Sequence, residues 1–439
     1  MRASGRRRVG LVPGRWVLVA ACVCAVWYAH GSTSAAGGAP LARVIGGGPA
    51  ACAAAIVLRN AGWAVEQYFP ALEPRHHLAV VGLNAARWIA SQGIAAQASG
   101  PVLQAVRERG VFDGGRLRRA PIYESPTGRA PRWPWNWIGR STHLVPIGAL
   151  EWALRGRAQA LGVELFPGAR ALDVHAVGGG SQLRFTGTSG GEARTTGAPA
   201  QLVVDASGLG SSVSWNGQLP ERRVAAQDAA LSSWMSVVPL AAGASATGAS
   251  AALPELLLFR VPDPAARFTA VVGGVQSYRD GSRQLSLEHA DRLRSPTNAE
   301  RNALLTHVAT QLGLNAATLE LDSAATFRAG LSRVARYWNG DASAPVVCLG
   351  DGAIEPHLRS GSGVSSSLAA AALLLPLAGG LQRGLRDMDT DTAAAALRAF
   401  AGQMAVLANA QAEVARALLV DHELWLNSFV PPSHGASGR

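Results

Sequence analysis

A glycine-rich turn between a short apolar strand and an alanine-rich helix constrains this chain more than any other feature. It reads Gly46-x-Gly48-x-x-Ala51. Gly46 permits a tight turn, Gly48 lets the backbone approach a pyrophosphate, and Ala51 lets the helix pack close to the strand. The helix begins with Pro49 and Ala50, and its first turn presents free N–H groups and a partial positive charge. The segment therefore predicts a dinucleotide-binding turn.

Composition narrows the classes of protein. The chain has 439 residues, 48% of them hydrophobic and 16% charged, which suits a compact enzyme of two structural units. The formal charge is +11, and every basic residue is Arg. Outside the N-terminus no Arg-dense patch is interleaved with aromatics, so we expect no nucleic-acid partner. Without Lys, Schiff-base and P-loop chemistry are excluded. The four cysteines form neither a disulfide framework nor a metal-ligand spacing, and we expect no metal site.

A second strand is predicted over residues 65–69. Its Glu66 follows Gly46 at the spacing of about 20 residues at which an acid binds the ribose of a dinucleotide. Phe69 occupies the end of the strand, where that acid is expected. We therefore assign Glu66 as a candidate ribose contact, and an exposed strand residue is the equal alternative.

Three tryptophans alternate in the segment Trp133-Pro-Trp135-Asn-Trp137. On an extended backbone they share one face. They are candidates for the wall of an aromatic substrate pocket, and a packed seam between domains fits equally well. An amphipathic helix is predicted over 148–161.

A buried strand over 202–204 leads into Asp205 and Gly208, and a later strand leads into Gly350 and Asp351. An Asp at a strand end can accept hydrogen bonds from sugar hydroxyls. The late segment continues into an Ala-rich helix, and its further candidate residues are Pro356, His357, Arg359, Gly361, Ser362, Gly363 and Val364. A Gly-x-Gly turn that opens a helix points N–H groups at an anion.

Taken together, these motifs resemble the flavin-dependent monooxygenases of the para-hydroxybenzoate hydroxylase type, whose relatives include halogenases, epoxidases and prenyl reductases. Three signatures stand in that family's order, beginning at Gly46, Asp205 and Gly350. The resemblance implies FAD as cofactor, NADH or NADPH as reductant, and oxygen transfer through a flavin C4a-hydroperoxide to an aromatic or polyketide-like substrate. Two positions depart from the pattern. Pro146-Ile147 stand where the family often has an Arg, and Ser365 stands where it often has an Asn.

The resemblance also assigns roles near the flavin. His357 is the candidate for acid–base work or a hydrogen bond to substrate, with ordering of its loop as the equal alternative. Arg359 is a candidate for binding an anionic substrate group, or for pairing with Glu355. Lys-dependent halogenation is excluded by the absence of Lys. Three alternatives stay open: hydroxylation of a tryptophan in a partner protein, an isoprenoid reductase or dehydrogenase, and a degenerate binding module.

We accordingly expect an α/β fold: a three-layer Rossmann-like FAD-binding domain, an inserted mixed β-sheet substrate domain, and C-terminal helices. The expected FAD-binding domain is discontinuous and comprises residues 41–75, 143–215 and 341–378. The substrate domain comprises 76–142 and 216–340. Helices follow over 379–428, and a disordered tail over 429–439.

The N-terminal residues 1–40 allow two interpretations. Arginines 6–8 precede an apolar run over 16–29 and small residues to 39, which resembles a signal peptide. Residues 6–39 would then export the chain or anchor it in a membrane. The alternative is an extension assigned upstream of the true start. We favour a cytoplasmic enzyme, because a reduced nicotinamide is a cytoplasmic reagent.

Overall fold

The structure is a computed structural model that describes residues 38–427, apart from 71–74, 76, 95–101, 114, 121–142, 188–189, 210–212, 230–231, 242–252, 265–270, 290–293 and 358–360. The N-terminal run, the tail from residue 429, Arg359 and the three alternating tryptophans (Trp133, Trp135 and Trp137) lie outside these described residues.

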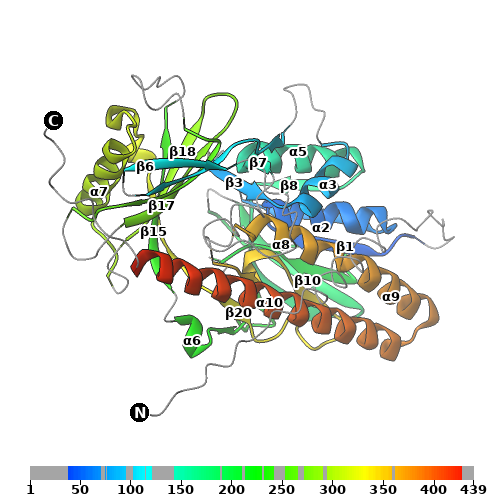
Figure 1. Cartoon of the computed structure of the whole chain (residues 1–439). Helices are drawn as coiled ribbons and strands as arrows, with labels where there is room; N and C mark the ends of the chain where they lie inside the picture. The colour runs from blue at the N-terminus through cyan, green and yellow to red at the C-terminus, as the bar shows by residue number, and fades with distance from the viewer. Residues whose placement is uncertain are drawn as a thin grey trace, which may run out of the picture.

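A five-stranded, wholly parallel sheet carries the first unit (Figure 1). Its strand order is β21 (Val346–Cys348), β12 (Leu202–Asp205), β1 (Leu41–Ile45), β2 (Ala64–Phe69) and β8 (Glu164–Pro167). Ile45 lies beside Asp205, which lies beside Cys348. Because parallel strands point the same way, the turns after β1, β12 and β21 meet at one edge of the sheet.

Two further layers enclose this sheet. Helix α2 (Pro49–Asn60) covers one face, flanked by α5 (Ile147–Ala160) and α8 (Gly363–Ala372). An antiparallel layer packs on the other face, with the order β11 (Arg194–Thr195), β10 (Gly180–Gly187), β9 (Ala169–Val177) and β13 (Ser214–Trp215), the last pairing in parallel. The α2 helix is buried on all sides because it consists largely of small residues, and only Arg59, near its end, carries a charge.

The second unit is a seven-stranded mixed sheet. Its order is β19 (Ala325–Ala329), β15 (Ser233–Leu240), β18 (Arg283–Glu288), β17 (Val271–Ser277), β16 (Leu256–Val261), β5 (Arg109–Asp113) and β6 (Arg116–Ala120). Only β16 and β5 pair in parallel. Helix α7 (Asn298–Gln311), which begins with a capping box between Thr297 and Glu300, packs on one face through an apolar cluster. The other face turns towards the first unit.

Two small sheets join the units. One has the order β3 (Leu78–Val81), β7 (His143–Pro146) and β4 (Gln104–Ala105), and the other β14 (Arg222–Arg223), β20 (Ser332–Val334) and β22 (Ile354–Glu355). The side chain of Gln284 in β18 bonds the backbone N and O of Leu78 and so fixes β3 to the seven-stranded sheet. Helix α3 (Leu83–Ser91) packs into the first core through Trp88 and Ile89. The segment 76–142 is therefore divided: α3 packs with the first unit, whereas β5 and β6 join the second.

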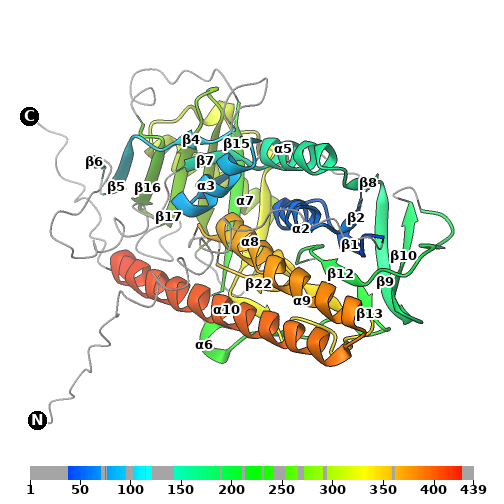
Figure 2. The same ribbon diagram turned by 90° about the vertical axis from the view of Figure 1, so that its right-hand side faces the viewer.

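The C-terminal helices tie both units together. Helix α9 (Leu374–Asp387) is followed by α10 (Thr390–Asn427), whose early turns pack into the first core at Leu397, Phe400 and Met404. The spacing of three and four residues places these side chains on one face. Further along, Leu418 packs against Leu256 and Leu258 of the second sheet. Figures 1 and 2 show α10 as one long helix that runs beneath both units.

The remaining elements are short: α6 (Ala226–Ala229) and the 3₁₀ turns Ala316–Thr318, Leu321–Ser323 and Gly350–Gly352. The helical run Gly363–Asp387, comprising α8 and α9, is long and apolar enough to cross a membrane, but 67% of its most apolar 18-residue stretch is buried inside the protein, as in a core helix. The structure confirms the expected fold class: a three-layer unit, an inserted mixed sheet and C-terminal helices.

Candidate cofactor site

The first glycine turn is built as predicted. Gly46 has φ +124°, a backbone conformation that residues with a side chain rarely adopt. A Cβ on Gly46 would lie 2.3 Å from the carbonyl oxygen of Ala206, so the turn after β1 and the turn after β12 touch through their backbones. The N–H of Gly46 donates to the carbonyl of Tyr68 at 2.8 Å, which holds the turn against β2.

The late glycine turn contacts the first one. Gly350 has φ +64°, and a Cβ on it would lie 2.7 Å from the Cβ of Ala50. Gly48 caps α2 with an extended backbone, Pro49 occupies the first turn, and Ala51 is fully buried. Segments far apart in the sequence thus meet at the N-terminus of one helix, where the N–H groups form an anion site.

An ion pair that the sequence analysis missed stands beside this helix terminus. The guanidinium of Arg75 pairs with the buried carboxylate of Glu151. A Cβ on Gly48 would lie 3.5 Å from Nη2 of Arg75 and 3.7 Å from Oε1 of Glu151. Arg155 lies 3.8 Å from Glu151 and 5.5 Å from the ring centre of Phe69. Glu151 and Arg155 stand one helical turn apart on α5, but no spacing rule links Arg75, which lies in a loop, to either of them.

The positive charge beside the first glycine turn therefore comes from Arg75, and not from an Arg at the start of α5 as the resemblance implied. Pro146 and Ile147 begin α5 without an Arg, whereas Arg75 stands beside Gly48 and its side chain is 47% exposed. Burial lowers the pKa of Arg75, Arg155 also lowers it, and Asp351 raises it. A cation that is half-exposed beside free N–H groups is suited to a phosphate.

Asp351 is available to a ligand. As a residue it is exposed to solvent. Loss of hydration beside the surrounding protein raises the pKa of the Asp351 carboxyl group, and the negative charge of Glu355 raises it further. The positive charges of Arg75 and Arg222 lower it. Arg222 donates to the carbonyl of Gly352 at 2.6 Å and so fixes the backbone next to Asp351.

Asp205 lies differently from the expected contact. It is 3% exposed, and its Oδ1 accepts from the N–H of Ser207 at 3.2 Å and from the Ser207 hydroxyl. Its Oδ2 accepts from the indole N–H of Trp215 at 3.1 Å. Both carboxylate oxygens are thus bonded inside the protein, and Asp205 holds the turn rather than facing a ligand. Gly208, with φ +92°, packs its backbone against Gly352.

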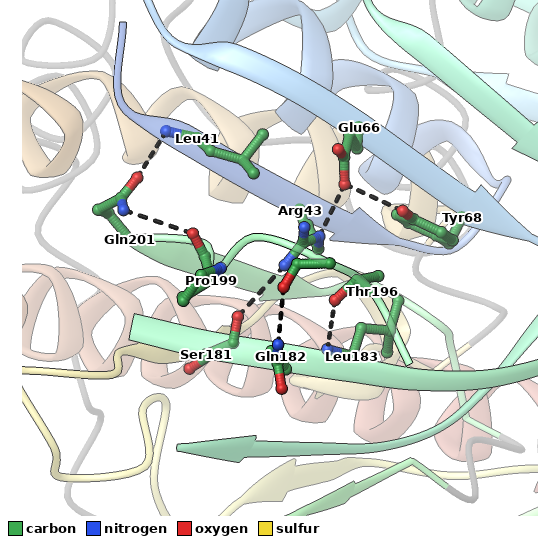
Figure 3. A network of polar contacts seen from close by, with 11 residues as sticks. Leu41, Arg43, Glu66, Tyr68, Ser181, Gln182, Leu183, Thr196, Pro199 and Gln201 are labelled. Carbon is green, nitrogen blue, oxygen red and sulfur yellow. Dashed lines mark hydrogen bonds and ion pairs between the residues drawn. The ribbon is translucent and has the colours of Figure 1, made fainter. Parts of the chain in front are cut away.

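Glu66 also differs from its expected place, as Figure 3 shows. It lies in the middle of β2, opposite Arg43 rather than the glycine turn. Its Oε2 accepts from Nε of Arg43 at 2.7 Å and from the hydroxyl of Tyr68 at 2.9 Å. Arg43 in turn donates to the carbonyl of Ser181 in β10. Glu66 therefore compensates a buried arginine between two sheets, and Phe69 is the residue at the strand's end.

No described side chain covers the N-terminus of α8 at Gly363. Gly361 has φ +59°, Ser362 caps α8, and no described atom lies within 4 Å of a Cβ built on Gly363. Val364 is buried. Ser365, at the position where the family often has an Asn, accepts a hydrogen bond from the N–H of Gly82 at 3.1 Å and so joins α8 to the start of α3.

Pro356 and His357 follow β22 directly. Pro356 is half-buried, and His357 is 1% exposed. Among the described residues no group of three or more His, Cys, Asp and Glu side chains comes together to hold a metal ion. Cys52 and Cys348 are buried and free, and burial raises the pKa of both thiols.

The comparisons with known proteins agree with this geometry. No family model and no curated protein matches the chain. Solved structures do match. The chain is similar to 2-methyl-3-hydroxypyridine-5-carboxylic acid oxygenase, at 19% identity and a TM-score of 0.61 over 89% of this chain and 94% of that one. It has the fold of a flavoprotein oxygenase.

Two other neighbours extend the comparison. The peptidyl tryptophan dihydroxylase QhpG, essential for tryptophylquinone cofactor biogenesis, is 18% identical, with a TM-score of 0.60 over 87% of this chain and 75% of that one. The myxobacterial chondrochloren halogenase CndH, a variant of the FAD-dependent halogenases, is 15% identical, with a TM-score of 0.60 over 79% and 76%. These are the enzyme types that the sequence motifs resemble, and at such identities the likeness establishes the fold.

Proposed function

We propose that the chain binds FAD and acts as an NADH- or NADPH-dependent monooxygenase of an aromatic or polyketide-like small molecule. The observation that carries this proposal is the meeting of Gly46, Gly48 and Gly350 at the N-terminus of α2. A Cβ on Gly46 or Gly350 would clash with protein, whereas a Cβ on Gly48 would lie at ordinary contact distance from the Arg75–Glu151 ion pair and would take up space beside the helix N-terminus. A close backbone approach of this kind is what a pyrophosphate needs.

The residues present fit FAD. The N–H groups at the start of α2, with Arg75, would hold the pyrophosphate. Asp351 would accept hydrogen bonds from the ribityl hydroxyls, because this residue is exposed at the adjoining turn. The start of α8, from Gly361 to Val364, would face the polar edge of the ring, since none of the described atoms lies within 4 Å of a Cβ built on Gly363. When bound, FAD would accept hydride from the nicotinamide and react with O₂.

The chain's own residues orient the reactants and exclude water. Arg222 fixes the backbone of the segment 350–356 through the carbonyl of Gly352. We assign His357 to acid–base work or a hydrogen bond at the substrate, because it is buried directly after β22. The face of the seven-stranded sheet opposite α7 is the proposed substrate side.

One alternative has an observation of its own. The similarity to QhpG, named as a peptidyl tryptophan dihydroxylase, favours a tryptophan in a partner protein as second candidate substrate. The two candidates differ in what stimulates NADPH oxidation: a small aromatic compound, or a folded or peptidyl tryptophan.

An absorbance spectrum of the purified full-length chain tests the proposal. We expect flavin bands that NADH or NADPH bleaches without oxygen and that recover in air. The variant Asp351→Asn should take up less FAD, whereas Asp387→Asn, an exposed carboxylate at the end of α9, should match the parent. Flavin bands that neither NADH nor NADPH bleaches would contradict the proposal that a nicotinamide reduces the flavin. A colourless chain that takes up no added FAD would contradict the whole proposal, and flavin turnover without oxygen consumption would indicate a reductase or dehydrogenase.

A further inference from the structure

A cavity of about 510 Å³ lies behind the flavin-binding turns, between the β14–β20–β22 sheet and helix α10. Figure 2 shows α6, β22 and α10 next to one another in this region. No residue of β15, β16, β17 or β18 lines the cavity, so it is separate from the proposed substrate side. Its volume is in the range of sites that hold small organic ligands.

The cavity carries an excess of positive charge. Four arginines line it, Arg222, Arg223, Arg333 and Arg416, against two carboxylates, Asp228 and Glu355. Arg416 binds Asp228 through two hydrogen bonds of 2.6 and 2.8 Å, and Arg222 lies 3.7 Å from Glu355. Both lining carboxylates are therefore already paired with arginines.

The two remaining arginines form a like-charge pair. Arg223 and Arg333 are directly opposite each other in the antiparallel ladder of β14 and β20. Like charges at opposite positions of a sheet repel. Arg333 donates to the neutral amide of Asn409 in α10 at 2.6 Å, and Arg223 lies 3.4 Å from Glu221, at a surface where both side chains are about two-thirds exposed. An anion between the two guanidinium groups would offset the repulsion and accept their forked donors.

Apolar side chains complete the walls. They include Val224, Leu331, Ile354, Pro356, Ala408 and Ala412, with Asn409 and Gln411 as hydrogen-bonding groups. A bare inorganic ion would leave this apolar lining uncovered. A charged group attached to a flat or apolar body matches both parts of the lining.

We propose that this cavity binds a small organic anion, with a phosphate or carboxylate held by Arg223 and Arg333. The site goes beyond the proposed flavin chemistry. It adjoins that site through Arg222, which lines the cavity and donates to the carbonyl of Gly352, and through Pro356, which also lines the cavity.

Calorimetric titration of the full-length chain at low salt tests the proposal, with 2′-AMP as a phosphate probe and 1-naphthoate as a carboxylate probe. We expect at least one probe to bind, and Arg333→Gln and Arg223→Gln to weaken it by about tenfold or more, as for loss of a charge-assisted contact. Ala412→Phe should abolish binding without a change of charge. Arg336→Gln, an exposed arginine outside the lining, is the matched control.

The two probes distinguish the sources of the anion. Preference for 2′-AMP indicates a phosphorylated nucleotide, and preference for 1-naphthoate indicates an aromatic carboxylate. The proposal is overturned if neither probe binds more tightly than about 1 mM, or if a probe that binds the parent binds Arg223→Gln, Arg333→Gln and Ala412→Phe equally well. Thermal unfolding of each variant shows whether it is folded. The titration needs no flavin, so its failure is distinct from failure of the proposed function.

Discussion

Replacing Gly48 by Ala should separate cofactor binding from folding. Gly48 has φ −79° and ψ 178°, an extended conformation open to any residue. The nearest atoms to an added Cβ are Nη2 of Arg75 at 3.5 Å and Oε1 of Glu151 at 3.7 Å, which are ordinary contact distances. The protein itself therefore has room for the methyl group. A pyrophosphate lying on the backbone at this turn would not.

The magnitudes follow from these contacts. Ala is a poorer N-cap than Gly, which costs the helix up to about 1 kcal/mol. Ala also restricts the unfolded chain more than Gly does, which stabilises the folded state by about 0.4–1 kcal/mol and offsets the loss at the N-cap. The free energy of unfolding without FAD should thus change by less than about 1 kcal/mol. If the methyl group displaces the pyrophosphate from one N–H, loss of that charge-assisted hydrogen bond costs about 1.5–3 kcal/mol. The dissociation constant for FAD should then rise about 10- to 150-fold.

Equilibrium titration of the flavin-free chain with FAD, followed by flavin fluorescence, measures this constant, and urea unfolding measures stability. Gly46→Ala is the informative contrast, because its Cβ would lie 2.3 Å from a backbone oxygen at φ +124°. That variant should lose about 2–5 kcal/mol of stability from strain and overpacking together. Unchanged FAD affinity in Gly48→Ala would refute the placement of the pyrophosphate at this turn.

Three further predictions concern buried groups. His357→Ala should retain FAD by absorbance yet lose most turnover, and unchanged turnover would remove His357 from the catalytic assignment. Trp215→Phe deprives the buried carboxylate of Asp205 of a donor, so urea unfolding should show a loss of about 1–3 kcal/mol. Trp152→Phe, at a 67% exposed position, should show none. Burial lowers the pKa of His289 from its ordinary 6.5 to about 4. Between these values the unfolded chain holds more protons, so the free energy of unfolding should fall with falling pH, by at most about 1.4 kcal/mol per pH unit. His289→Gln should show a shallower decline between pH 7 and 5, and an identical slope would contradict the shift.

The sequence predicted best where backbone geometry dictates residue type. The glycine turns at Gly46 and Gly350 were found because a positive φ and a close backbone approach admit almost no other residue. The fold class followed from those turns and from the strands that lead into them. The helix expected over 148–161 is observed as Ile147–Ala160, since its apolar periodicity marks it clearly.

Side-chain roles were harder to predict, because they depend on what packs against each strand. Glu66 has the spacing of a ribose ligand, yet Arg43, three residues before the turn, needs a carboxylate inside the protein and takes it. Asp205 stands at a strand end, yet Trp215 returns from the antiparallel layer to bond it. Arg75 and Glu151 meet only in the folded chain, and no local pattern links a loop residue to a residue on a helix 76 positions later.

The short ladder of β14 and β20 has a consequence for how the chain can fold. Strands β15 to β19 lie between these two strands in the sequence. The chain therefore leaves the first unit after β14 and returns to it at β20, and the two strands pair there, with Arg222 opposite Val334 and Arg223 opposite Arg333. The parallel pairing of β12 with β21 must wait for that return. Because the entropy of closing a loop rises with the length of free chain within it, an excursion already folded into hairpins brings its ends together at a lower cost. Pairing among β15 to β19 therefore lowers the cost of bringing β21 beside β12, whereas β5 and β6 join these strands from an earlier part of the chain.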